Sequence, residues 1–106
     1  MTGPEGGEFI MYVHEPYNTM IKQGLKTMEI KEMDEYWQNL QPGDKIKIIC
    51  DESYPFFVFV TNISMDVDII NNIVNIDKIM PGATISSYFK FYENIENKVI
   101  ITFNCY

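Results

Sequence analysis

Short stretches of alternating apolar and polar residues recur along the chain, and each is a candidate β-strand. The clearest is residues 27–31, in which Met28 and Ile30 point to one side while Thr27, Glu29 and Lys31 point to the other. Other stretches are rich in β-branched and aromatic residues, which favour strands. The pattern predicts five strands, at residues 10–13, 27–31, 45–50, 56–63 and 99–103.

Apolar residues at helical spacing lie between these strands. Pro16 suits the first turn of a helix that Gly24 ends. Apolar residues 67, 70 and 74 predict a second helix, which begins at residue 64 or 66 and ends near residue 74. Thr84 is a candidate N-cap for a third helix, and residues 34–40 read as a short helix or a turn.

The order of these elements predicts an α+β fold, a small mixed β-barrel with short flanking helices. A length of 106 residues is enough for one domain and too short for two. Residues 1–9 hold three of the six glycines and show no apolar periodicity, so we interpret them as a flexible leader. The single domain then comprises residues 10–106.

Composition and charge narrow the classes of function. The net charge of −7 is opposite in sign to that of a nonspecific nucleic-acid binder, and every basic residue is lysine, so no guanidinium is present to grip phosphate. No apolar run is long enough to span a membrane and no signal peptide is evident, which predicts a cytoplasmic protein. Cys50 and Cys105 read as reduced core thiols rather than a metal or redox pair, and we expect no metal and no cofactor.

The polar face of residues 27–31 is the first candidate for chemistry. If this face points into a barrel, Glu29 and Lys31 lie side by side, partly shielded from water, and need partners. Lys26 directly precedes the strand and is expected at the same cleft mouth. The alternative is a solvated strand face that carries an ordinary surface ion pair.

Aromatic residues near the C-terminus are the second candidate. Tyr88 and Tyr92 are four residues apart, so they lie together on the third predicted helix, either as part of an apolar core stripe or as a platform for a base. Phe91 lies off that stripe, and its expected exposure indicates a surface contact. His14 is the only histidine, and no acid partner other than Glu15 lies near it in the sequence, so we assign no catalytic residue.

The segment Gly24-Leu25-Lys26-Thr27-Met28-Glu29-Ile30-Lys31, followed by the turn Gly43-Asp44, resembles the ASCH domain of the PUA-like superfamily. The hallmark of that family is Gly-x-Lys-x-x-Glu-x-Arg followed by a Gly-Asp turn into a strand. Residues 79–82 and 88–92 also fit the family pattern, and the similarity runs from about residue 12 to residue 103. Lys31 stands where the family usually has arginine.

The resemblance implies a small barrel with a cleft that binds RNA or a nucleotide-like ligand. The residues that it assigns to ligand binding, together with the two tyrosines, are Gly24, Lys26, Thr27, Glu29, Lys31, Tyr88 and Tyr92. Two alternatives remain open. One is a hydrolase acting on acetylated cytidine or on RNA, although the threonine nucleophile of such enzymes would fall at Glu29. The other is a protein-interaction domain that has lost its ligand, with a protein as its partner.

Overall fold

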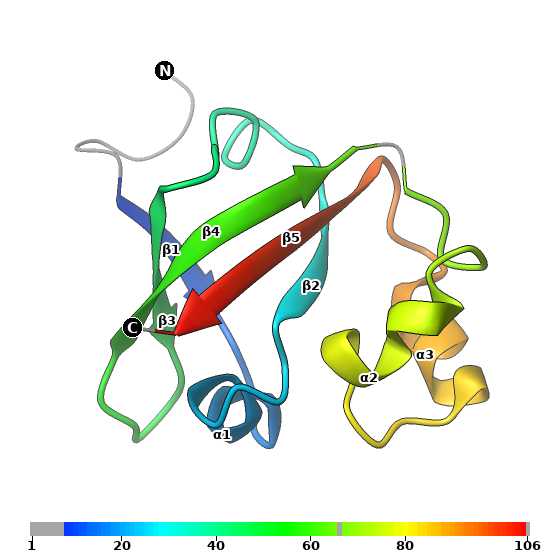
Figure 1. Ribbon diagram of the computed structural model, residues 1–106, viewed down its shortest axis with the longest axis horizontal. Coiled ribbons are helices and arrows are strands. Elements are labelled where there is room, and N and C mark those ends of the chain that lie inside the picture. The colour runs from blue at the N-terminus through cyan, green and yellow to red at the C-terminus, as the bar shows by residue number, and fades with distance from the viewer. Residues whose placement is uncertain (1–7, 66, 106) are drawn as a thin grey trace.

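The alternating stretches of the sequence form five strands in the computed structural model, which describes residues 8–65 and 67–105 (Figure 1). The five predicted strands are confirmed, with ends that differ by one or two residues. They are β1 (Glu8–Tyr12), β2 (Met28–Glu32), β3 (Lys45–Ile49), β4 (Phe56–Ser64) and β5 (Lys98–Cys105). Because β1 begins at Glu8, residues 8 and 9 belong to the sheet and not to the expected leader, and residues 1–7 lie outside the described residues.

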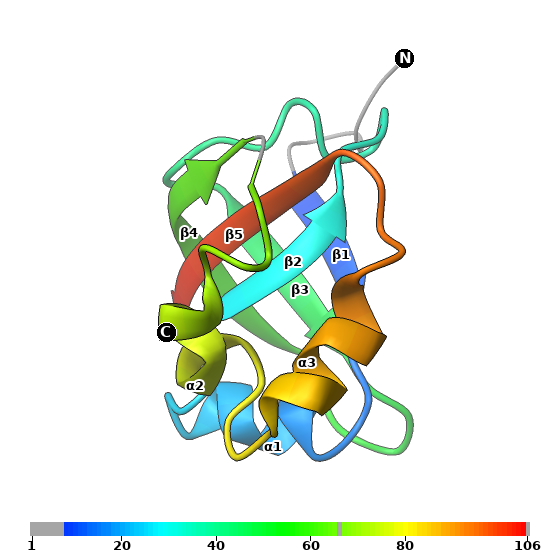
Figure 2. The ribbon, with the colours of Figure 1, turned by 90° about the vertical axis from the view of Figure 1, so that its right-hand side faces the viewer.

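The strands form one curled, mixed sheet in the order β1-β3-β4-β5-β2, which makes β1 and β2 its two edges (Figure 2). β1 pairs with β3 in parallel, and all the other neighbours are antiparallel. The sheet curls into a half-barrel, which agrees with the predicted small mixed barrel of an α+β fold. This curl brings the two edge strands, which are far apart in the strand order, to opposite sides of one opening.

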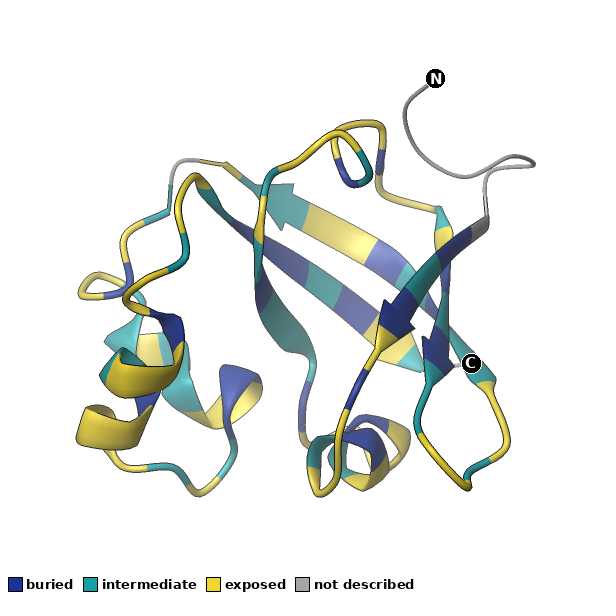
Figure 3. Ribbon diagram, turned by 180° about the vertical axis from the view of Figure 1, so that it is seen from behind, coloured by how far each residue is buried: buried dark blue, intermediate teal, exposed yellow. Residues whose placement is uncertain are grey.

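Two apolar clusters hold the sheet and the helices together (Figure 3). The first fills the concave side of the sheet, and Ile46, Ile48 and Val58 within it are completely buried. The second joins β2 and β5 to the helices through Ile30 and Ile100, which lie directly opposite each other in the sheet. β5 contributes to both clusters and is covered on both faces, and each fully buried apolar side chain contributes about 1.5–3 kcal/mol.

The first and third predicted helices are confirmed as α1 (Tyr17–Lys22) and α3 (Ile85–Tyr92). Thr84 caps α3, since its hydroxyl oxygen accepts a hydrogen bond from the Ser87 amide at 3.1 Å. Gly24 follows α1 with φ of 77°, a left-handed conformation that favours glycine. Residues 34–40 form turns, and Trp37 packs from them into the first cluster.

The second predicted helix is wrong. β4 continues to Ser64, and the chain then turns repeatedly until the short 3-10 segment η2 (Ile73–Asn75) and the single-turn helix α2 (Ile76–Ile79). Ile70 and Val74, which were expected to pack on one helical face, are exposed. Side-chain hydrogen bonds explain the turns, because the Asp68 carboxylate accepts from the Ile70 amide and competes with helical pairing.

Candidate ligand-binding groove

A groove of about 650 Å³ lies in the opening between the two edge strands. The end of β1 and the residues after it form one wall, β2 forms the opposite wall, and the end of α3 closes one side. No other strand separates β1 from β2 across this opening, since they are the outer members of the sheet. The lining residues are Tyr12, Val13, His14, Glu15, Tyr17, Glu29, Ile30, Lys31, Glu32, Phe91, Tyr92, Asn94 and Ile95.

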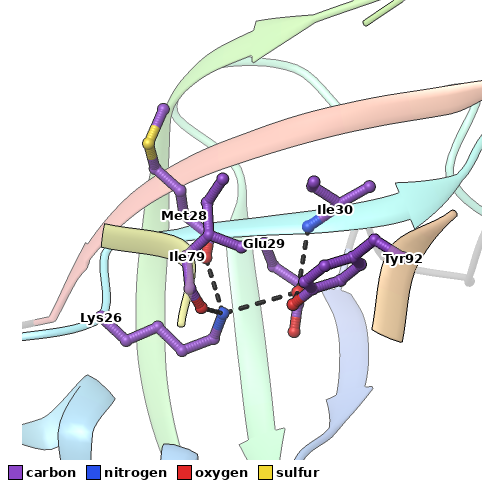
Figure 4. A network of polar contacts seen from close by, with 6 residues as sticks. All are labelled: Lys26, Met28, Glu29, Ile30, Ile79 and Tyr92. Atoms are coloured by element: carbon purple, nitrogen blue, oxygen red, sulfur yellow. Dashed lines mark hydrogen bonds and ion pairs between the residues drawn. The ribbon is translucent and has the colours of Figure 1, made fainter. Parts of the chain in front are cut away.

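Glu29 is the most constrained polar side chain of this groove (Figure 4). Its Oε1 accepts hydrogen bonds from the Tyr92 hydroxyl at 2.6 Å and from the Ile30 amide at 3.0 Å. The same oxygen lies 3.5 Å from the Lys26 ammonium. No hydrogen bond to Oε2 is found within the described part of the chain, and the side chain is 15% exposed. One carboxylate oxygen therefore fixes the group, while the other remains open to an incoming donor.

Lys26 lies behind this carboxylate and not at the mouth of the groove, where the sequence had placed it. Its side chain is 1% exposed, and its Nζ donates to the main-chain carbonyl oxygens of Met28, at 2.7 Å, and Ile79. Two of the three N–H donors of the ammonium are thus used by carbonyl oxygens, and Glu29 is its ion-pair partner. Lys26 therefore positions Glu29 and joins β2 to α2, and its burial keeps it away from a ligand in the groove.

Burial controls the ionisation of the two partners of Glu29. It lowers the pKa of Lys26, and the Glu29 carboxylate opposes this shift only in part. It also raises the pKa of Tyr92, and the negative charge of Glu29 adds to that rise. Tyr92 therefore keeps its proton at neutral pH, and its hydroxyl donates a hydrogen bond that holds the Glu29 carboxylate in place.

Lys31 differs from Lys26 in having no ion-pair partner among residues 8–65 and 67–105. It is half-buried on β2, two residues beyond Glu29 and on the same side of the strand. Within the lining set it is the only lysine, beside three glutamates and His14. The groove is thus acidic overall, with one free cation on its β2 wall.

Two exposed aromatic side chains line the groove. Tyr12 is 73% exposed at the end of β1, and Phe91 is 61% exposed on α3. Single exposed apolar residues are common on protein surfaces, and what distinguishes these two rings is that both line the same groove. The Tyr12 and Phe91 rings offer flat apolar faces beside the Glu29 carboxylate.

The predicted site residues divide into two groups. Glu29, Lys31 and Tyr92 line the groove. Gly24, Lys26, Thr27 and Tyr88 do not. Gly24 is exposed at the end of α1, Thr27 joins Lys78 and Phe103 through its main chain, and Tyr88 is fully buried, with its hydroxyl donating to the Ile69 carbonyl oxygen. Tyr88 therefore belongs to the core, which was the alternative interpretation of the aromatic stripe.

Sequence reasoning missed Tyr12 as a lining residue and noted Phe91 only as a surface contact. Tyr12 lies between the buried residues Met11 and Val13, so the alternation of its strand already placed it on the outer side. The strand order could not be predicted from the sequence, and it is this order that brings the outer side of β1 next to β2. Within the described ranges no cluster of three or more metal-ligating side chains is present, and no helix is long and apolar enough to cross a membrane.

The comparisons with known proteins bear on the fold. No protein-family model matches the sequence, and no curated protein matches it significantly. Several solved structures resemble it in fold, among them the following three. The hypothetical protein PH0355 is 23% identical with a TM-score of 0.69, over 93% of this chain and 99% of the other. ASCH from Zymomonas mobilis is 14% identical with a TM-score of 0.68, over 92% and 67%. PF0455 from Pyrococcus furiosus is 21% identical with a TM-score of 0.64, over 92% and 96%. The chain therefore has an ASCH-type fold.

Proposed function

We propose that this ASCH-type domain binds a nucleobase of a nucleoside or of single-stranded RNA in the groove between β1 and β2. Glu29 Oε2 accepts a hydrogen bond from an amino group of the base, and the rings of Tyr12 and Phe91 contact its faces. The observation that carries the proposal is the state of Glu29, whose Oε1 is held by two hydrogen bonds and an ion pair while Oε2 is left without a partner in the described chain.

The fixed carboxylate favours a donor over an acceptor on the ligand. A ligand N–H that meets Oε2 forms a charge-assisted hydrogen bond, and Glu29 does not lose rotamer freedom on binding because its rotamer is already set. A ligand carbonyl at the same place meets a second negative oxygen and is repelled. Cytosine and adenine carry an exocyclic amino group, and uracil carries a carbonyl there.

The charge of the groove supports a base rather than a phosphate beside Glu29. Glu15 and Glu32 line the groove with Glu29, and the Lys26 ammonium is already surrounded by protein oxygens. In this proposal Lys26, which the family resemblance assigned to ligand binding, instead has a positioning role. Base recognition at splayed, single-stranded sites combines such edge contacts with stacking on aromatic rings.

The test is a titration of the full chain with cytidine and with uridine, followed by NMR chemical shifts. We expect Glu29, Ile30 and Tyr92 signals to move with cytidine, and cytidine to bind roughly tenfold more tightly than uridine. Glu29→Gln should remove this preference, because its amide can present a donor to the ligand. Glu35→Gln is the matched control, since Glu35 is exposed and lies outside the groove. Equal affinity for both nucleosides would exclude the proposed contact.

The same samples separate the alternative functions. Chromatography after incubation with N4-acetylcytidine and with labelled RNA detects product if the domain is a hydrolase. A chain that binds no nucleoside or RNA but captures a stable protein partner would instead be an interaction domain. The hydrolase alternative lacks its threonine nucleophile, because the corresponding position is occupied by Glu29.

A further inference from the structure

A second, smaller groove of about 440 Å³ continues the opening between β1 and β2. It lies toward the start of β1 and the turns after β2. Its lining residues are Ile10, Met11, Tyr12, Lys31, Asp34, Tyr36 and Trp37. Tyr12 and Lys31 line both grooves, one from each edge strand, so the two grooves are neighbours that meet at this pair of side chains.

We infer that the two grooves bind adjacent nucleotides of one RNA strand, with Lys31 contacting the phosphate that links them. This inference rests on the proposed function of the larger groove. It extends the proposed ligand by a second base and places one phosphate between the two bases. The smallest ligand that fills both grooves is then a dinucleoside monophosphate.

Lys31 is placed where a linking phosphate is required. It is the only lysine that lines either groove, and it makes no ion pair in the described chain. Every other charged side chain of the two grooves is acidic, apart from His14. A phosphate at either far end would therefore lie among carboxylates, whereas a phosphate at the junction meets an unpaired ammonium.

The second groove is rigid and aromatic. Trp37 stacks on Phe9 with ring centroids 5.7 Å apart, and Tyr36 packs edge-on against Trp37 at 4.8 Å. The Tyr36 hydroxyl accepts a hydrogen bond from the Ile10 amide at 2.7 Å, which fixes its ring against β1. Trp37 is buried in the first cluster, so the half-buried Tyr36 ring is the one available to a base, with Trp37 behind it. Stacking on a ring is tolerant of base identity, so the second groove should select little between bases.

The edges of the two strands argue against a peptide as the occupant. A peptide added to a sheet edge needs unpaired main-chain amides. The Ile10 amide of β1 already donates to Tyr36, and the Ile30 amide of β2 already donates to Glu29. At the opening, one outward amide on each edge is therefore already occupied by a side chain, which leaves a peptide strand fewer main-chain partners there.

The experiment compares cytidine, cytidine monophosphate and the dinucleoside monophosphate of cytidine and adenosine. Trp37 is the only tryptophan, so its indole resonance and fluorescence report the second groove alone. We expect the dinucleoside monophosphate to bind roughly tenfold more tightly than cytidine and to move the Trp37 signals, which cytidine leaves unchanged. The affinity of cytidine monophosphate should exceed that of cytidine by less, because no second base holds its phosphate at the junction.

Lys31→Gln should abolish the roughly tenfold difference in affinity between the dinucleoside monophosphate and cytidine, with both ligands measured on the same variant. Lys78→Gln is the control, because Lys78 is exposed on α2 and lines neither groove. In the unaltered chain the logarithm of the association constant should fall with the logarithm of salt concentration with a slope of about −0.7, the value for one phosphate on a single strand, and this slope should vanish in Lys31→Gln.

Three outcomes would overturn the inference. They are a dinucleoside monophosphate that binds no better than cytidine, a gain that survives in Lys31→Gln, and Trp37 signals that do not move. If cytidine still shifts the Glu29 signals in the unaltered chain, the proposed function stands while this inference fails. If no nucleoside or dinucleoside shifts any groove residue, the proposed function fails and this inference fails with it.

Discussion

At the residue scale, Glu29 stabilises the fold as well as shaping the groove, because its carboxylate lies beside a buried ammonium. Glu29→Gln leaves Lys26 with its two carbonyl partners and no opposite charge, so we expect the free energy of unfolding to fall by about 2 kcal/mol. Urea denaturation at pH 7 measures the change. Glu35→Gln, on an exposed turn, should stay within about 0.5 kcal/mol of the unaltered chain. Equal values for the two variants would contradict this role.

Tyr92 should give the protein a distinctive loss of stability in alkali. Burial and Glu29 raise its folded-state pKa well above the ordinary value of 10.0. Below pH 10 both the folded and the unfolded chain hold this proton. Above pH 10 only the unfolded chain releases it, so the unfolded state gains and stability falls, by up to ~1.4 kcal/mol per pH unit.

Tyr92→Phe isolates this effect. Near neutral pH the variant should be about 1 kcal/mol less stable, because Glu29 loses a donor. It also lacks the group whose titration lowers stability, so the gap between the two proteins should narrow between pH 10 and pH 11. Denaturation series at both pH values check this, and a constant gap would show that Tyr92 titrates normally.

The sequence predicted one half of this arrangement and not the other. Lys26 and Glu29 are three residues apart, so their proximity follows from local spacing alone. Tyr92 reaches Glu29 across a separation of 63 residues. Nothing in its helical spacing distinguishes it from Tyr88, which lies in the same buried cluster but donates to the Ile69 carbonyl oxygen. The free oxygen of Glu29 is likewise a product of tertiary contacts, because it depends on which donors occupy Oε1.

At the scale of elements, α3 depends on its N-cap, and its far end carries Tyr92 and Phe91 to the groove. Thr84→Ala removes the oxygen that accepts from the Ser87 amide, so we expect a loss of about 1 kcal/mol in the free energy of unfolding. Ser86→Ala is the control, since Ser86 is exposed in the same turn and does not cap the helix. A Thr84→Ala variant as stable as Ser86→Ala would mean that packing alone starts the helix.

Helices and strands were predictable where the spacing of apolar residues and the local side-chain hydrogen bonds favoured the same element. The strands follow from alternation, and α3 follows from its capping threonine and its stripe. The helix expected at residues 64–74 had the right apolar spacing but the wrong local chemistry. Asp68, Asn72 and Asn75 bind nearby main-chain and side-chain groups, and these contacts stabilise successive turns instead of a helix.

At the scale of the whole molecule, the groove is a consequence of strand order. The neighbours in the order β1-β3-β4-β5-β2 are paired, and the curl of the sheet leaves β1 and β2 facing each other without pairing. Alternation places Tyr12, Glu29 and Lys31 on particular sides of their strands, but only this order makes those sides adjacent. Sequence reasoning could therefore name the residues of one wall and not the opening between the two.

The charge of the whole chain should limit the length of RNA that binds well. A net charge of −7 repels every phosphate that lies beyond the junction at Lys31, and no second lysine lines either groove to offset that repulsion. We therefore expect affinity to rise from nucleoside to dinucleoside monophosphate and to change less than about threefold on further extension, since each added phosphate brings repulsion without a new cation. Titrations with single strands of increasing length at fixed salt, with duplex RNA as the comparison, test this expectation. Affinity that climbs steadily with each added nucleotide would place a basic path elsewhere on the surface, and tight binding of the duplex would be incompatible with a groove that accepts splayed bases.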